Sequence, residues 1–135
     1  MTMKTILVAL CLTLAACAGG LSQTPGTPPV PALRVQESDA GKPITIEPGR
    51  RLILRLPANH TLGYRWILAS SSGNSLEPIG VPFYTGDNLE DKGGAEYWTF
   101  VPRRAGTHEL RFEYRRPWEK DKPSDKTLSY TVNVR

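Results

Sequence analysis

Cysteine and histidine, which proteins often use for disulfides, metal sites and nucleophilic catalysis, are scarce in this sequence. Its 135 residues include two cysteines and two histidines. Both cysteines, Cys11 and Cys17, lie near the N-terminus, so residues 33–135 contain no pair that could form a disulfide. The domain must therefore be stabilised by an apolar core, which about 100 residues can supply.

Long hydrophobic runs are also missing. The apolar stretch at residues 6–14 has nine residues, whereas a helix that spans a bilayer needs about 20. Lys4 precedes this stretch and the small residues Ala15 and Ala16 follow it. The pattern predicts a secretory signal peptide over residues 1–16.

The end of this signal, LAAC at residues 14–17, resembles the lipobox of bacterial lipoproteins. The resemblance implies cleavage before Cys17 and lipidation of that residue, which would explain an odd cysteine in an exported chain. Several acyl chains would anchor the protein durably in a membrane. In lipoproteins an aspartate after the cysteine favours the inner membrane, whereas this chain has Ala18. We therefore expect an outer-membrane lipoprotein of the bacterial cell envelope, facing the periplasm or the cell surface; the alternative is an ordinary signal peptide with a chance cysteine.

The segment after the signal has the composition of a linker. Residues 17–32 begin with the lipidated cysteine and continue mainly with Pro, Gly, Ser and Thr. A proline-rich chain of this kind extends by about 3.1 Å per residue. We predict that residues 17–32 form a tether and that residues 33–135 form a single domain.

Helical periodicity is absent from the domain. Short runs of alternating apolar and polar residues are separated instead by turn residues such as Pro48 and Gly49. Prolines within residues 76–86 predict an edge strand there, because proline cannot donate to a sheet. The pattern predicts an all-β fold, an immunoglobulin-like antiparallel β-sandwich of about seven to eight strands without a disulfide, in which Trp66 is buried.

The residues needed for catalysis or metal binding do not converge in this sequence. His60 lies in a predicted loop, whereas His108 begins a strand at an outward-facing or edge position, so we expect no shared metal site. Three acidic residues, Asp87, Glu90 and Asp91, lack the spacing of an EF-hand. We therefore expect a protein that is not an enzyme and that needs no metal or cofactor.

The charge of the chain gives little indication of a partner. Lys and Arg number 17 against 13 acidic residues, a net charge of +4. The basic residues are scattered in pairs between acids and form no continuous stripe, which makes nucleic acid an unsuitable partner. We expect a monomer.

Three polar loops stand out between the predicted strands: the first loop (residues 58–63), the second loop (residues 85–96) and the third loop (residues 115–125). Loops on a rigid sandwich often contain binding residues. If the strands follow the usual order, these are the B–C, D–E and F–G loops. The B–C and F–G loops open at the same end of such a sandwich, so we predict that the first and third loops are neighbours.

The three loops resemble those of the chagasin-like inhibitors of papain-type cysteine peptidases. That family has the pattern N-P-T-T-G-Y/F-x-W in its first loop, glycines in its second and R-P-W in its third. The corresponding residues here are Asn59-His60-Thr61-Leu62-Gly63-Tyr64-Arg65-Trp66, Gly93-Gly94 and Arg116-Pro117-Trp118. The resemblance implies an immunoglobulin-like fold and reversible inhibition of a papain-like cysteine peptidase, without a cofactor. The first loop would block the catalytic cysteine and histidine, and the other two would grip the rims of the cleft.

The resemblance assigns peptidase binding to Asn59, His60, Thr61, Leu62, Gly63, Gly93, Gly94, Arg116, Pro117 and Trp118. Tyr64 and Trp66 match the pattern too, but their inward alternation indicates a structural role. Trp118 either binds a partner or covers the open end of the sandwich. His60 replaces the family's proline and Leu62 its second threonine, which leaves two alternatives: an inhibitor of another peptidase class, and an envelope binding lipoprotein that does not inhibit.

Overall fold

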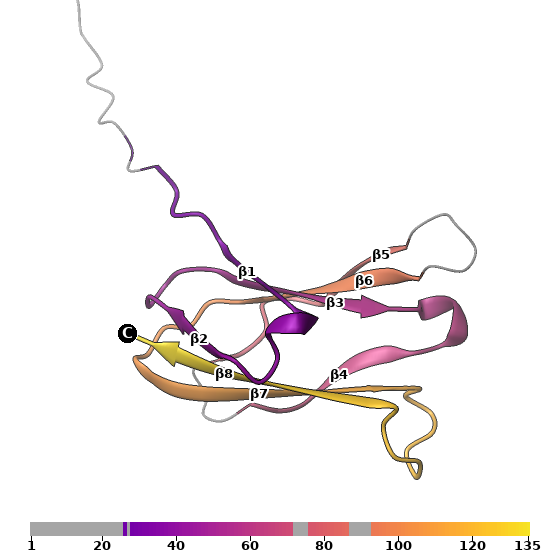
Figure 1. The fold of residues 1–135 in the computed structure, drawn as a ribbon. Helices are drawn as coiled ribbons and strands as arrows, with labels where there is room; N and C mark the ends of the chain where they lie inside the picture. The colour runs from indigo at the N-terminus through magenta and orange to yellow at the C-terminus, as the bar shows by residue number, and fades with distance from the viewer. Residues whose placement is uncertain (1–25, 27, 72–75, 87–92) are drawn as a thin grey trace, which may run out of the picture.

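The computed structural model describes residue 26 and residues 28–71, 76–86 and 93–135, which form two packed β-sheets (Figure 1). One sheet has the strand order β1 (Leu33–Gln36), β3 (Leu52–Ala58), β6 (Gly94–Phe100), β5 (Phe83–Gly86). The other has the order β2 (Pro43–Ile46), β8 (Lys126–Val134), β7 (Gly106–Arg115), β4 (Arg65–Ser71). Two short 3-10 helices, η1 (Glu37–Asp39) and η2 (His60–Leu62), complete the described elements. The predicted signal peptide, Cys17 and most of the tether lie outside the described residues.

The structure confirms the all-β sandwich, with β5 at the edge of its sheet as predicted. The sheets are mixed, however, and not wholly antiparallel. Strand β1 runs parallel to β3, and β2 runs parallel to β8. The chain passes from one sheet to the other between β1 and β2 and returns between β2 and β3, so the predicted strands on either side of Pro48 and Gly49 do not pair. Alternation in the sequence determines which side chains face inward, but it does not determine which strands pair.

The core lies between the inner faces of the two sheets. Leu52, Leu54 and Leu56 of β3 are fully buried, as are Leu110 and Phe112 of β7 and Tyr130 and Val132 of β8. Phe112 is at the centre of an aromatic cluster, with its ring edge-on to Trp98, Phe100 and Tyr130 at centroid distances of 5.1, 6.4 and 6.2 Å. Trp66 is buried as predicted, and its indole Nε1 donates to Pro57 O at 2.8 Å.

The prediction for His108 was wrong. This side chain is buried on the same face of β7 as Leu110 and Phe112. The alternation that buries Leu110 and Phe112 also includes His108, two residues before Leu110. His108 therefore faces inward near the end of the sandwich. His60 lies in the first loop, near the opposite end of β7.

Tyr130 supplies a buried phenol that must remain protonated in the fold. Its hydroxyl donates to Gln36 O at 3.2 Å, and burial raises the pKa of Tyr130 from 10.0 to about 12. The resulting stability is fully present below pH 10 and is lost as the pH rises toward 12, because the unfolded phenol ionises first. We expect Tyr130→Phe to remove this part of the stability loss at alkaline pH, which amounts to about 3 kcal/mol at most. Denaturant unfolding of the unchanged protein and of Tyr130→Phe between pH 9 and 12, about the range set by these pKa values, measures the difference. If the free energies of unfolding of the two proteins fall with pH to the same extent, this account is contradicted.

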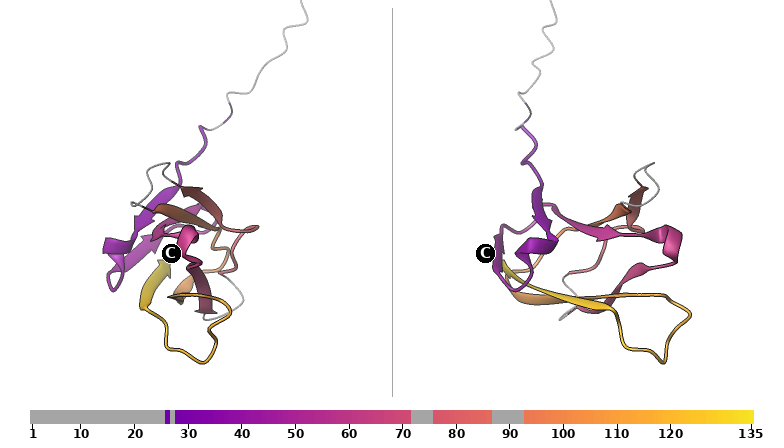
Figure 2. Two further views of the ribbon diagram at one scale, coloured as in Figure 1. Left: turned by 90° about the vertical axis from the view of Figure 1, so that its right-hand side faces the viewer. Right: turned by 45° about the vertical axis from the view of Figure 1, so that its right-hand side comes forward.

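The strand ends bring the three loops to one end of the sandwich. Strands β3, β5 and β7 end there and β4, β6 and β8 begin there, opposite the C-terminus (Figure 1). Figure 2 shows η2 and the β7–β8 connection projecting beyond the strands at this end. None of the helices in the described part of the chain is long and apolar enough to cross a membrane.

Candidate functional site

The first loop is a short capped helix. Asn59 precedes η2 in an extended conformation, and its side-chain Oδ1 accepts hydrogen bonds from Thr61 N at 3.1 Å and Leu62 N at 3.4 Å. Gly63 ends η2 in the left-handed region, with φ 82°. Asparagine at the start and glycine at the end are the residues that favour these two conformations. The sequence thus builds a loop with a defined shape.

Tyr114 of β7 holds the start of this loop. Asn59 N donates to the Tyr114 hydroxyl at 2.8 Å, and the Tyr114 ring stacks on Tyr64 and packs against Trp66. Burial raises the pKa of Tyr114, so the phenol remains neutral. The predicted inward positions of Tyr64 and Trp66 correspond to this aromatic support beneath the loop.

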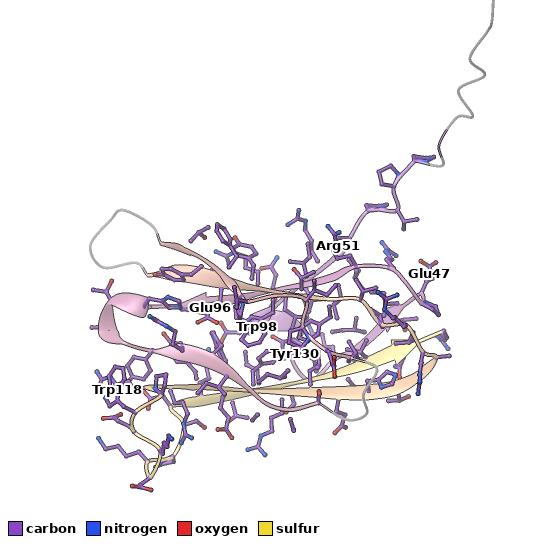
Figure 3. The ribbon with its side chains drawn as sticks, turned by 180° about the vertical axis from the view of Figure 1, so that it is seen from behind. Glu47, Arg51, Glu96, Trp98, Trp118 and Tyr130 are labelled. Atoms are coloured by element: carbon purple, nitrogen blue, oxygen red, sulfur yellow. The ribbon has the colours of Figure 1, made fainter. Side chains whose placement is uncertain are left out.

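The third loop presents Trp118 on a turn. Glu119 N donates to Arg116 O at 3.0 Å, which makes Pro117 and Trp118 the two central residues of a β-turn. Proline favours the first central position because its φ is already fixed near the required value. The Trp118 side chain is 67% exposed at the end of the molecule (Figure 3).

Direct contacts join the third loop to the first, which confirms that the two are neighbours. Arg116 Nε donates to Leu62 O at 3.0 Å, and its guanidinium lies 4.7 Å from the centroid of the Tyr64 ring. Asp125 accepts a hydrogen bond from the Tyr64 phenol and thereby raises the pKa of Tyr64. The Trp118 ring lies directly against Gly63.

Glycines at the base of the second loop bring it close to the first. Gly94 pairs with Ala58 of β3 and Gly86 of β5, and a Cβ on Gly94 would overlap the Thr85 carbonyl. Gly93 lies beside Ala58 and Asn59, where a Cβ would approach Ala58 O to 3.1 Å. Residues 87–92, which include Asp87, Glu90 and Asp91, lie outside the described residues.

His60 turns its ring away from the loop surface toward the sheet of β5 and β6. Its Nε2 lies 2.7 Å from Glu96 Oε1, and its ring stacks on Tyr84 with centroids 3.6 Å apart. Our sequence reasoning missed Tyr84 and Glu96. A signal for Glu96 was present, because alternation along β6 places Glu96 on the same face as Trp98 and Phe100.

The close contact between Gly63 and Trp118 leads to a specific expectation. Alanine at Gly63 would have to adopt a left-handed φ and would drive its Cβ into the Trp118 ring. We expect Gly63→Ala to cost about 1–2 kcal/mol in backbone strain and to displace the ring, making Trp118 fluorescence easier to quench with acrylamide. Gly49→Ala is the matched control, because Gly49 has φ 81° but open space around its Cβ position. Equal quenching in the two variants would show that Trp118 does not rest on Gly63.

The described part of the site is therefore an ordered, exposed edge. Leu62 is 57% exposed beside Trp118, and Thr61 is exposed between Asn59 and Leu62. Within the described ranges, no group of three or more His, Cys, Asp or Glu side chains could hold a metal ion. This geometry is suited to insertion into a cleft of another protein, since its tip combines a hydroxyl, an aliphatic side chain and an aromatic ring.

Comparison with known proteins identifies the family. The model of the chagasin family of peptidase inhibitors, I42, matches residues 45–133. The chain belongs to this family. Chagasin from Trypanosoma cruzi is 27% identical over 107 residues, which cover 76% of this chain and 96% of chagasin. The family consists of peptidase inhibitors and not of enzymes, so the expectation that this chain is not an enzyme is confirmed.

Solved structures of similar proteins have the same fold. The cysteine protease inhibitor EhICP2 from Entamoeba histolytica has a TM-score of 0.67 at 20% identity, covering 77% of this chain and 95% of that one. Amebosin has a TM-score of 0.63 at 28% identity, covering 78% of this chain and all of Amebosin. The match covers the whole of the solved Amebosin chain, so a two-sheet domain of this fold forms a chain on its own there. The assignment of individual loop residues to peptidase binding stays a prediction.

Proposed function

We propose that this protein is a reversible inhibitor of papain-like cysteine peptidases and that its three loops enter the active-site cleft. The observation that carries the proposal is the joining of the first and third loops into one exposed edge by Arg116 and Trp118. Membership in the chagasin family supports inhibition, and EhICP2 is described as a cysteine protease inhibitor.

The physical basis of inhibition is a binding edge that exists before the peptidase arrives. Ordering a loop on binding costs about 0.5–1.5 kcal/mol for each flexible side chain that is immobilised. Here the Asn59 cap and the Arg116 hydrogen bond order the first loop in the free protein. A smaller part of the contact energy is then lost to ordering the loop on binding.

Each loop has a distinct role in this proposal. The first loop places Thr61 and Leu62 over the catalytic cysteine and histidine of the peptidase, and Gly93 and Gly94 bring the second loop to one rim. On the other rim Trp118 contacts the peptidase, because an exposed tryptophan is among the most frequent binding hot spots. Leu62 presents an aliphatic side chain where the family has a hydroxyl, so the preferred peptidase has an apolar surface next to its catalytic residues.

We further propose that lipid on Cys17 and the tether of residues 17–32 hold the domain at the outer membrane, where it acts as a monomer. The support is the sequence of residues 1–32 alone. The mass of the protein extracted from membranes tests this directly: acylated Cys17 at the mature N-terminus is expected, and a soluble product that begins elsewhere would refute lipidation.

Competition for the cleft tests the proposed mode of inhibition. A fragment of residues 28–135, which is the domain with the end of the tether, is expected to bind papain and to lose that binding when a covalent active-site reagent fills the cleft. Binding that persists with a filled cleft would exclude insertion of the loops. Inhibition of only a serine or metallopeptidase in a parallel panel would keep the inhibitor function but replace the target class. The absence of binding to any peptidase would favour a non-inhibitory envelope role.

A further inference from the structure

We infer that His60 is a positioning residue, which fixes the first loop to the strands that flank the second loop through Glu96 and Tyr84. This inference rests on the proposed inhibitory function for its effect on binding. Its effect on the loop itself can be measured in the free protein.

The His60 ring is held from two directions. Its Nε2 meets Glu96 Oε1 of β6 at 2.7 Å, and its plane stacks on the ring of Tyr84 of β5 with 10° between the planes. Only 20% of the His60 side-chain surface is exposed. The His60 ring therefore packs against the sheet of β5 and β6, and Thr61 and Leu62 form the exposed tip of the loop.

Glu96 is a fixed acceptor in this contact. It is 2% exposed, and its Oε1 accepts from Trp66 N at 3.1 Å while its Oε2 accepts from Trp98 Nε1 at 3.1 Å. A carboxylate that already accepts from two buried donors cannot rotate without leaving them unpaired. With Oε1 and Oε2 acting as acceptors, the facing His60 Nε2 is the donor.

The contact also completes the support of the loop. Arg116 and Trp118 hold the C-terminal half of the first loop, at Leu62 and Gly63, on the side of the third loop. His60 holds the N-terminal half on the opposite side, at the strands on both sides of the second loop. Without the His60 ring, the described contacts anchor η2 mainly from the third-loop side and through Asn59.

His60 thereby replaces the constraint that proline provides in the family's loop pattern. Proline fixes φ through its ring, whereas His60 restrains the same residue through contacts with Glu96 and Tyr84. The backbone remains compatible with proline: Asn59 is extended, with φ −122° and ψ 93°, and the side chain of Asn59 bonds Thr61 N and Leu62 N rather than His60 N. His60→Pro is therefore a rescue variant that restores the restraint by a different route.

Amide hydrogen exchange in the free domain tests the positioning role independently of any peptidase. In His60→Ala, the Thr61 and Leu62 amides are expected to exchange about tenfold faster than in the unchanged domain, and in His60→Pro they return to within about threefold of it. Tyr84→Leu removes the stacking but leaves Glu96 its partners, so we expect an intermediate increase in the exchange rates of the Thr61 and Leu62 amides. This variant replaces His60→Ala in the test if His60→Ala fails to fold. Unchanged exchange in a folded His60→Ala would overturn the inference.

Inhibition of papain separates positioning from a general effect on stability. A tenfold fall in the population of the bound loop shape raises the inhibition constant about tenfold, which is expected for His60→Ala. His60→Pro should recover inhibition to within about threefold but not the thermal stability, because Glu96 still lacks its His60 partner. If His60→Pro inhibits papain as weakly as His60→Ala does, the inference that His60 positions the first loop is wrong. If the unchanged domain does not inhibit while the exchange results hold, the proposed function fails and the positioning role stands.

Discussion

Glu96→Ala is expected to lower the free energy of unfolding by about 3 kcal/mol or more. The substitution removes the acceptor of three donors at once: Trp66 N, Trp98 Nε1 and the His60 ring. Each buried donor left without a partner costs about 1–3 kcal/mol, and the lost side chain also leaves a cavity. Urea unfolding of the domain, with the free energy extrapolated to water, measures the loss.

Glu113→Ala is the matched control for this prediction. Glu113 is also a strand carboxylate, but it pairs at 3.6 and 3.7 Å with Arg111 and Arg115 on the outer face of β7. Ion pairs of this kind contribute at most about 1 kcal/mol. If both variants lose the same stability, the buried Glu96 network does not have the importance given to it here.

Trp118→Ala is expected to weaken inhibition of papain by about 30-fold or more, equivalent to about 2 kcal/mol, with little change in stability. The side chain is 67% exposed, so its removal takes away contact surface for a partner more than core packing. Inhibition constants and unfolding free energies of the same two proteins measure both effects.

Val81→Ala provides the control for a general loss of apolar surface. Val81 is 90% exposed and lies in none of the three loops, so its substitution should leave inhibition unchanged. If Trp118→Ala destabilises the domain while inhibition of the folded fraction is unaffected, Trp118 is a cover for the end of the sandwich and not a binding residue.

Much of the fold could be predicted because alternation reports burial directly. The inward positions of Leu52, Leu54 and Leu56, the burial of Trp66 and the edge position of β5 all follow from side-chain spacing and proline chemistry. The parallel pairing of β1 with β3 and of β2 with β8 could not be predicted, because it depends on where the chain crosses between the sheets. His108 was misplaced because the first residues of a strand give too short a pattern to fix its phase.

The site was predicted in outline but not in its supporting contacts. Sandwich topology brought the first and third loops together, and the hydrogen bond from Arg116 to Leu62 O follows from that arrangement. The contact of His60 with Glu96 and Tyr84 joins residues 36 and 24 positions apart along the chain. No local pattern links them, so the sequence shows only that His60 replaces the family's proline, whereas the folded chain shows the contacts that restrain this residue.

The inhibition constant of residues 28–135 against papain, from steady-state competition with a peptide substrate, tests the central claim most directly. The account predicts saturable, reversible inhibition that is competitive with substrate, since the loops and the substrate occupy the same cleft. No inhibition up to about 100 μM, which corresponds to a binding free energy weaker than about −5.5 kcal/mol, would contradict it for papain-like peptidases.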